Sequence, residues 1–440
     1  MSAARIERVR GRRVWDSRGH PTVEAEIRLA NGAGGRAIAP AGASTGSREA
    51  RELRDGGDRL AGLDVGAAVR GINTEIAGVL NGMDATDQAS VDAALIELDA
   101  TADRSRLGAN AMVAVSMAAA HAAAAAVNTP LWRHLLGSDA AVLPLPEIQI
   151  FGGGAHAGRR TDIQDFMVMA PRAASFSEAL AWTAAVYHAA GDRLARDGLR
   201  AGVADEGGHW PAFATNEQGL EHLLGAIECA GFIPGEDVVI SLDVAASAFG
   251  RNGRYRLGLE QRELDSDGLA ELIGGWIERF PIASVEDPLA EDDEVGLQKF
   301  TRAFGEHVQI VGDDYLVTDA DRVTGAAAGE ICNAVLLKPN QRGTLSETRA
   351  ALDAARSAGW GAIVSARSGE TEDVTIAHLA VGWGVPQLKV GSFSRSERMA
   401  KWNECLRIEE SLGDAAVFAG RLPLRGVYGG HRARVPEDGG

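Results

Sequence analysis

The chain begins with the hydrophobic pattern of a small α+β domain. Apolar and polar residues alternate over residues 22–29, turn-forming Asn and Gly occupy 31–35, and a second short alternating run covers 36–39. Such alternation around a turn predicts a strand hairpin. Apolar spacing typical of helices follows it, with Gly, Asn or Asp at the ends of each segment. The predicted helices are 65–80, 86–98 and 109–127.

A second pattern fills the rest of the chain. From residue 147 onward, short apolar runs alternate with amphipathic stretches, which predicts strands alternating with helices in a parallel barrel. A doubly wound sheet is disfavoured because no GxGxxG motif opens a helix after the first strand. The predicted helices are 175–196, 217–230, 267–279 and 345–358. With a proline-containing junction at 137–146, we predict an α+β capping domain over 1–138 and a β/α barrel over 139–440.

Composition narrows the class of protein. The 440 residues, 45% of them hydrophobic, are enough for two cores. A net charge of -17 without any basic run argues against a nucleic-acid partner. Cys229, Cys332 and Cys405 are far apart, which disfavours disulfides and thiolate metal sites and favours a cytoplasmic location.

The N-terminus and the alanine-rich stretch bear on membrane association. Residues 1–15 contain several arginines but no apolar core segment, so we expect no signal peptide. Asn110, Ser116 and His121 interrupt the apolar stretch 109–127, so we expect a buried helix there and no membrane span.

Charged residues stand at the ends of the predicted barrel strands. Asp243, Glu286 and Asp313 each close or follow an apolar run, and Lys338 and Lys389 do the same. In a β/α barrel the active site is built at the C-terminal ends of the strands. Three carboxylates suit Mg²⁺, which prefers oxygen ligands and keeps positions for substrate. We therefore predict a cation-assisted site for proton abstraction.

The two lysines have two possible roles. Burial disfavours the charged ammonium, so a lysine at this rim is expected to have a lowered pKa and to act as a general base. Repulsion between Lys338 and Lys389 would lower one pKa further. The alternative is an ion pair with a carboxylate of the metal site. Nearby acids are expected to cap helices or to support the ligands; these are Asp287, Asp292, Asp293 and Asp314.

Nine ordered motifs between Asp16 and about Gly420 resemble enolase. They are DSRGHPTVE (16–24), GASTG (42–46), LGANA (107–111), HAG (156–158), DEGG (205–208), EDP (286–288), LKPNQ (337–341), RSGETED (367–373) and SRSER (394–398). The resemblance implies a small α+β domain followed by an eight-stranded enolase-type β/α barrel, in a homodimer or a higher homo-oligomer. It also implies a glycolytic hydro-lyase that converts 2-phosphoglycerate, a small phosphorylated carboxylate, to phosphoenolpyruvate.

The resemblance also implies residue roles. The catalytic positions match Lys338 as base, Glu206 as the acid for hydroxide departure, and His156 and Asp165 near the substrate. Substrate-binding positions match Gln164, Arg367, Ser368 and Lys389. Two Mg²⁺ per active site are expected, with Asp243, Glu286 and Asp313 as ligands and Ser44 contacting the second ion from a lid.

Two departures from the enolase pattern fall in the active site. Asp165 stands where the family has glutamate, and Ala366 stands where it has histidine. A shortened carboxylate can miss its partner, and misplacement by about 1 Å can lower a rate roughly a hundredfold. Loss of the imidazole next to Arg367 creates space in which a different phosphorus substituent could fit.

Three functions remain open from the sequence. The first is Mg²⁺-dependent dehydration of 2-phosphoglycerate. The second is an enolase paralogue from a phosphonate or phosphinate natural-product (antibiotic) pathway that forms carboxyphosphonoenolpyruvate. The third is a catalytically impaired enolase-fold protein that binds a macromolecule or a surface.

Overall fold

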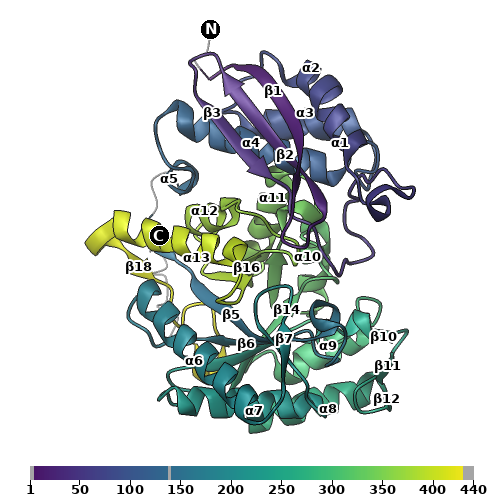
Figure 1. Cartoon of the computed structure of the whole chain (residues 1–440), viewed down its shortest axis with the longest axis vertical. Coiled ribbons are helices and arrows are strands. Elements are labelled where there is room, and N and C mark those ends of the chain that lie inside the picture. The colour runs from purple at the N-terminus through teal and green to yellow at the C-terminus, as the bar shows by residue number, and fades with distance from the viewer. Residues whose placement is uncertain (1–3, 137–139, 430–440) are drawn as a thin grey trace, which may run out of the picture.

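The N-terminal part forms a three-stranded sheet covered by helices. The computed structural model describes residues 4–136 and 140–429 (Figure 1). Strands β1 (Ile6–Trp15), β2 (Pro21–Leu29) and β3 (Gly34–Ile38) are antiparallel neighbours in chain order. The pairing of β2 with β3 confirms the predicted hairpin, and β1 is an additional strand that was not predicted. The predicted helices lie close to their expected limits: α1 (Gly66–Gly71), a π-helical turn (Ile72–Ile76) and α2 (Ala77–Leu80) together cover the first, and α3 (Gln88–Asp99) and α4 (Ala109–Ala126) are the others. A short helix that was not predicted, α5 (Leu131–Leu136), follows them.

Small residues let α4 pack closely on this sheet. A Cβ atom at Gly35 in β3 would lie 2.2 Å from both the Ala118 carbonyl oxygen and the Ala122 nitrogen of α4. Helix α4 is the one helix of the described residues long and apolar enough to cross a membrane, and 83% of it is buried inside the protein. Packing against β2 and β3 accounts for its apolar composition.

The second part is a closed barrel. Its eight strands follow the order β17-β16-β15-β14-β13-β9-β6-β5, and β17 pairs with β5 to close the ring. The bounds are β5 (Leu145–Gly152), β6 (Asp165–Met169), β9 (Val239–Asp243), β13 (Ile282–Glu286), β14 (Gln309–Gly312), β15 (Ala334–Leu337), β16 (Gly361–Ser365) and β17 (Gln387–Gly391). The predicted boundary between residues 138 and 139 lies outside the described residues and stays a prediction.

The expectation that every strand is parallel is wrong for β6. This strand runs antiparallel to both of its neighbours, β5 and β9. The link between β5 and β6 contains one 3₁₀ turn (Gly154–Ala157) and no crossover helix, so the chain reverses direction. Because β6 is reversed, its first residue lies at the rim where its neighbours end.

Helices surround the barrel (Figure 1). Their bounds are α6 (Phe176–Arg196), α7 (Asn216–Cys229), α8 (Ser266–Arg279), α9 (Glu294–Phe304), α10 (Ala320–Ala328), α11 (Leu345–Ser357), α12 (Thr375–Gly382) and α13 (Ser396–Leu412). Polar residues cap several of them, and Asp293, as expected, accepts a hydrogen bond from the Gly296 amide at 3.0 Å.

Shorter elements complete the fold. The strands β10 (Gly250–Arg251), β11 (Arg254–Leu257) and β12 (Arg262–Asp265) form a separate antiparallel sheet at the side of the barrel (Figure 1). The others are β4 (Val142–Leu143), β7 (Arg200–Val203), β8 (His209–Pro211) and β18 (Val417–Phe418), with 3₁₀ turns at Arg59–Gly62, Ala246–Ala248, Pro339–Gln341, Gly413–Ala415 and Gly426–Tyr428.

The N-terminal domain contacts the barrel mouth through the loop at 42–46. The preceding residue, Ala41, forms an isolated β-bridge with Gly369 of the loop after β16. Deeper in the contact, buried Asp92 of α3 accepts hydrogen bonds from the amide and hydroxyl of Ser346 at 2.9 and 2.6 Å. The loop 42–46 is therefore held over the end of the barrel where the strands terminate.

Candidate active site

The strand ends deliver the predicted charges to one rim of the barrel. Asp243 and Glu286 are the last residues of β9 and β13 and stand opposite each other in the strand register. Asp313 follows β14 directly, Lys338 follows β15, and Lys389 lies within β17. Parallel neighbours with matched register place such residues around one cavity.

Asp165 reaches the same rim by a different route. It is the first residue of the reversed strand β6, and its register partners are Asp243 on β9 and Gly152 on β5. Gln164 precedes it and donates a hydrogen bond to Asp243 Oδ2 at 3.1 Å.

The two lysines form ion pairs with the predicted metal ligands. Lys389 Nζ lies 2.8 Å from Asp243 Oδ2 and 2.7 Å from Glu286 Oε2. Lys338 Nζ donates a short hydrogen bond to Asp313 Oδ2. Gln341 donates to the other oxygen of Asp313 at 2.9 Å. Each carboxylate of the trio therefore faces a cationic group of the chain itself.

The prediction of a lowered lysine pKa is wrong for the chain by itself. Burial acts to lower the pKa of Lys338, and Arg367 and Lys389 act in the same direction, but Asp313 and Glu286 outweigh them and the pKa is raised. The pKa of Lys389 is raised well above its ordinary value although burial opposes this, because Asp243 and Glu286 stabilise the ammonium. Repulsion between the lysines exists as expected, but the neighbouring carboxylates dominate.

The donor set fits a hard cation such as Mg²⁺. Glu286 Oε1 is buried and has no hydrogen-bond partner among the described residues, so this oxygen is free to bind an ion. Burial, followed by the nearby Asp243 charge, raises the pKa of Glu286 well above its usual range, which a divalent cation would reverse. Carboxylate oxygens are the ligands that Mg²⁺ prefers.

Asp287 supports this rim through the backbone. Its two carboxylate oxygens accept hydrogen bonds from the amides of Asp313 and Asp314 at 2.9 and 2.8 Å. Ligand oxygens of Asp287, Asp313 and Asp314 lie within 4.8 Å of one another. Since Asp287 is already occupied by two amides, it orients the segment that carries Asp313, as expected for a supporting group.

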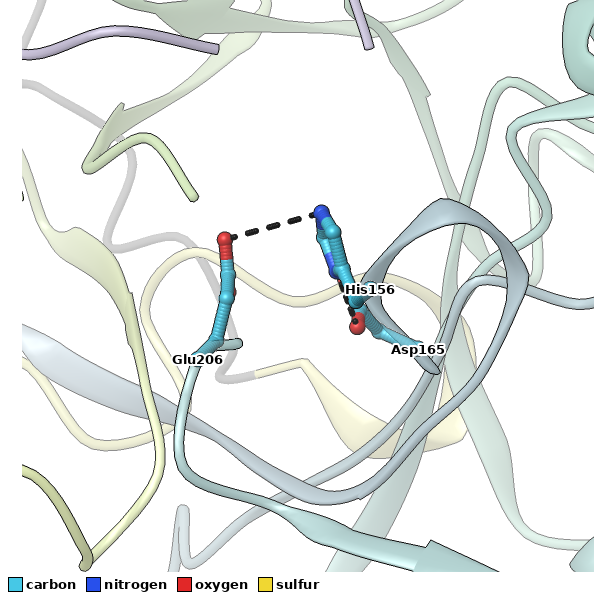
Figure 2. Close-up of side chains that lie close together, drawn as sticks. All are labelled: His156, Asp165 and Glu206. Atoms are coloured by element: carbon cyan, nitrogen blue, oxygen red, sulfur yellow. Dashed lines mark hydrogen bonds and ion pairs between the residues drawn. The ribbon is translucent and has the colours of Figure 1, made fainter. Parts of the chain in front are cut away.

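A histidine lies between two carboxylates on another side of the site (Figure 2). His156 Nδ1 is 3.2 Å from Asp165 Oδ1, and His156 Nε2 is 3.9 Å from Glu206 Oε1. Burial acts to lower the pKa of His156, but Asp165 and Glu206 together raise it. Burial acts to raise the pKa of Glu206, but His156, Arg398 and the lysines leave it lowered. The pair therefore favours an imidazolium beside an ionised Glu206.

Asp165 is buried at the end of this row. Its Oδ1 accepts a hydrogen bond from Gln149, while its Oδ2 has no hydrogen-bond partner among the described residues and lies 3.9 Å from Lys389 Nζ. Burial is the main reason that the pKa of Asp165 is raised. The shortened side chain is thus in contact with His156 and aims one oxygen into the site.

The Arg367 guanidinium binds the carboxylate of Glu49 and the backbone of the loop at 42–46. Its Nη1 lies 2.9 Å from Glu49 Oε2 and 3.1 Å from Asn340 Oδ1, and its Nη2 donates to the Ser44 carbonyl oxygen at 3.0 Å. The guanidinium predicted to bind phosphate is therefore neutralised by Glu49. The neighbouring Ser368 hydroxyl accepts a hydrogen bond from the Ala43 amide at 2.5 Å.

Part of this rim lines one small cavity of about 20 Å³, whereas Glu286 and Asp313 are not among its lining residues. The lining residues are Ser44, His156, Gln164, Asp165, Glu206, Asp243, Lys338, Ser365, Ala366, Arg367, Ser368 and Lys389. That volume accommodates a water molecule but no phosphorylated acid, so a ligand of that size could enter only if some of these lining residues moved apart.

Four contributors were not found from the sequence. Glu49 neutralises Arg367, Gln341 binds Asp313, and Gln149 binds Asp165. Arg398 is fully buried and donates to the carbonyl oxygens of Arg367 and Ser368, so it fixes their loop. Three of them, Glu49, Gln341 and Arg398, lie in or beside the enolase-like motifs of the sequence. That proximity was the one sequence feature that could have indicated their place in the site.

The whole fold agrees with comparison to known families. Residues 6–135 match the family model described as enolase, N-terminal domain, and residues 140–425 match enolase, C-terminal TIM barrel domain. The chain therefore belongs to the enolase family. Membership suggests a lyase-type enzyme that acts on a small molecule and binds Mg²⁺.

Proposed function

We propose that the protein is a Mg²⁺-dependent hydro-lyase that interconverts 2-phosphoglycerate with phosphoenolpyruvate and water. One observation carries this proposal: Lys338, Glu206 and Asp243 line the same cavity, and the carboxylates of Glu286 and Asp313 pair with its two lysines. Dehydration of this kind needs a base for the α-proton and an acid for the departing hydroxide; Lys338 suits the first role, and Glu206 together with its neighbour His156, whose pKa is raised, suits the second.

Lys338 is proposed as the base. Mg²⁺ bound by Asp243, Glu286 and Asp313, with Ser44 near a second ion, would supply positive charge that stabilises the dianionic carbanion. With the carboxylates engaged, the attraction that raises the pKa of Lys338 is weakened. Burial, Arg367 and Lys389 remain, and all three lower that pKa. The neutral amine can then accept the α-proton.

Glu206, His156 and Asp165 are proposed to handle the second proton. The carbon–oxygen bond at the neighbouring carbon breaks, and the hydroxide leaves as water once it receives a proton. The raised pKa of His156 makes the imidazolium a store for that proton, and Glu206 Oε1 lies 3.9 Å from His156 Nε2. Asp165 holds the imidazole from the other side at 3.2 Å.

Lys389, Gln164, Arg367 and Ser368 are proposed to bind substrate. Lys389 is suited to bind the carboxylate of the substrate, because its ammonium already binds the carboxylates of Asp243 and Glu286. Arg367 suits the phosphate because a guanidinium offers two parallel donors to its oxygens. In the closed structure these donors bind Glu49 and Ser44, so the substrate phosphate must displace at least one of them.

The proposal is tested by ultraviolet absorbance of the enol product. Purified protein with Mg²⁺ and 2-phosphoglycerate is expected to give a rising signal that Lys338→Ala abolishes. Lys299→Ala is the matched control, since Lys299 is exposed and pairs with Asp267 on the surface at 2.9 Å. A flat trace with wild-type protein would refute the proposed substrate.

A second candidate is dehydration of a phosphorus-modified analogue to carboxyphosphonoenolpyruvate. The observation that favours it is the position of Ala366, which lines the cavity between Ser365 and Arg367 where the family has an imidazole. Such an enzyme would exchange the α-proton of 2-phosphoglycerate with solvent yet form little enol product from it. Rapid turnover of 2-phosphoglycerate would exclude this candidate.

A catalytically impaired binding protein is the weakest candidate. The rim holds Lys338 and Glu206 together with the carboxylates of Asp243, Glu286 and Asp313, and a purely structural role does not require such a set. The free cysteines support a reducing cytoplasmic location, and the homodimer is expected from the family resemblance alone.

A further inference from the structure

An arginine-lined hollow lies outside the active site. It has a volume of about 850 Å³ and is bounded by the β10–β12 sheet, by the turn after β9 and by the loop after β5. Four arginines line it: Arg159, Arg251, Arg254 and Arg256. The volume falls within the range of pockets that bind organic ligands.

Two of these arginines stand opposite acidic residues across the β11–β12 pair, Arg254 opposite Asp265 and Arg256 opposite Glu263, but without ion-pair contact. None of the four forms an ion pair with any residue that the structure describes, and Arg159 has one long contact with the Ala248 carbonyl oxygen at 3.5 Å. Two acids also line the hollow. Glu263 is exposed, whereas Asp162 accepts hydrogen bonds from the Gly258 amide at 2.7 Å and from Asn216 Nδ2 at 2.9 Å. Four arginines against two acids leave the lining with an excess of positive charge, on a chain whose net charge is -17.

The strand geometry keeps two of the guanidinium groups on one face. In β11, Tyr255 and Leu257 are buried, so the alternating residues Arg254 and Arg256 face outward together. Tyr255 anchors the strand, since its hydroxyl donates to Asp293 at 2.7 Å and accepts from the Ala290 amide at 3.1 Å. The two arginines thus stand on a rigid element tied to the barrel.

We propose that this hollow binds a phosphate-bearing organic anion of nucleotide size. Guanidinium groups bind phosphate oxygens through paired donors, and several of them can share a diphosphate. Phe249, Ala248 and Leu264 supply an apolar wall for a ring or a sugar. Inorganic phosphate alone would leave most of the volume unused.

The hollow adjoins the active-site loops. Arg159 follows the turn that carries His156, and Ala248 belongs to the turn after Asp243. A second hollow of about 320 Å³ shares Ser247, Gly250 and Arg251 with the first and reaches Ser47 and Arg48, just after the lid loop. An anion bound in the first hollow would therefore contact the segment that carries His156, whereas residues 47 and 48 belong to the second hollow, which Glu291 and Asp292 also line.

Calorimetric titration of the full chain with ADP tests the proposal. We expect ADP to bind wild-type protein, and to bind at least tenfold more weakly to the variant Arg251→Gln, Arg254→Gln, Arg256→Gln. The matched control is Arg10→Gln, Arg196→Gln, Arg200→Gln, which removes the same charge from exposed positions outside the hollow. Adenosine and pyrophosphate should each bind more weakly than ADP, and added NaCl should weaken ADP binding because the arginines are exposed.

Several results would overturn the proposal. These are absence of ADP binding, equal affinity in both triple variants, equal affinity for pyrophosphate and ADP, or loss of ADP binding when 2-phosphoglycerate is present at saturation. Urea unfolding of both variants establishes that they are folded. Because binding is measured without turnover, failure of the proposed hydro-lyase activity would leave this test unaffected.

Discussion

Replacing Arg367 by lysine retains the positive charge but removes the two parallel N–H donors of the guanidinium, which we call the fork. Arg367 makes two hydrogen bonds to Glu49, at 2.9 and 3.2 Å, with further bonds to Asn340 and Ser44. Both charged side chains are almost completely buried, with 3% and 7% exposure. A lysine ammonium is a point charge and cannot face Glu49 with two parallel donors while it also reaches the lid.

The expected effect follows from the lost bonds. Arg367→Lys keeps about two of the four contacts, and each hydrogen bond to a charged group contributes about 1.5–3 kcal/mol. The free energy of unfolding should therefore fall by roughly 3–6 kcal/mol. If the same fork binds the substrate phosphate, kcat/KM should fall at least about a hundredfold, since each 1.4 kcal/mol corresponds to a factor of ten.

Urea denaturation and steady-state kinetics measure the two effects separately. Arg172→Lys is the matched control because Arg172 pairs with Glu236 at 2.9 Å on an exposed surface, where the pair contributes little. A variant at Arg367 that behaves like the Arg172 control in both assays would refute the assigned role of the fork.

Three further predictions concern pH, metal and packing. Burial and then His121 lower the pKa of His378 to about 4, so as the pH falls the unfolded chain binds the extra proton before the folded chain does. The free energy of unfolding should therefore fall by roughly 3 kcal/mol as the pH drops from about 6.5 to 4. The variant His378→Gln should flatten that pH dependence. Mg²⁺ at about 100 times its dissociation constant should raise the free energy of unfolding by about 2.7 kcal/mol, and Glu286→Gln should reduce this gain, both measured by urea denaturation with and without chelator. Gly35→Ala should lower the melting temperature, because its Cβ would lie 2.2 Å from backbone atoms of α4 and overpacking costs about 1–3 kcal/mol, whereas Gly78→Ala, with open space around it, should not.

The sequence was sufficient to predict the barrel and the charges at its rim, because a charge that ends an apolar run is a local signal. The reversal of β6 was not predictable in this way, since the apolar run at 165–169 looks the same in either direction. The lysine pKa values were also missed. They depend on close contacts of Lys389 with Asp243 and Glu286 and of Lys338 with Asp313, which only the closed barrel sets.

The number of lysines in the sequence gives a further indication of which residues belong to the site. The chain has four lysines, and Lys299 is the exposed one. Lys401 is buried, where it lies 2.9 Å from Glu370, and Lys338 and Lys389 line the cavity. Arginine serves elsewhere on the surface, but it cannot give up its proton near neutral pH and so cannot replace a lysine base.

Exchange of the substrate α-proton with solvent deuterium tests the central claim most directly. Exchange needs the base and the cation but no departure of hydroxide, so it isolates the step assigned to Lys338. We predict that wild-type protein and Lys299→Ala exchange the α-proton of 2-phosphoglycerate in the presence of Mg²⁺ and that Lys338→Ala does not. Exchange that persists undiminished in Lys338→Ala would contradict the account.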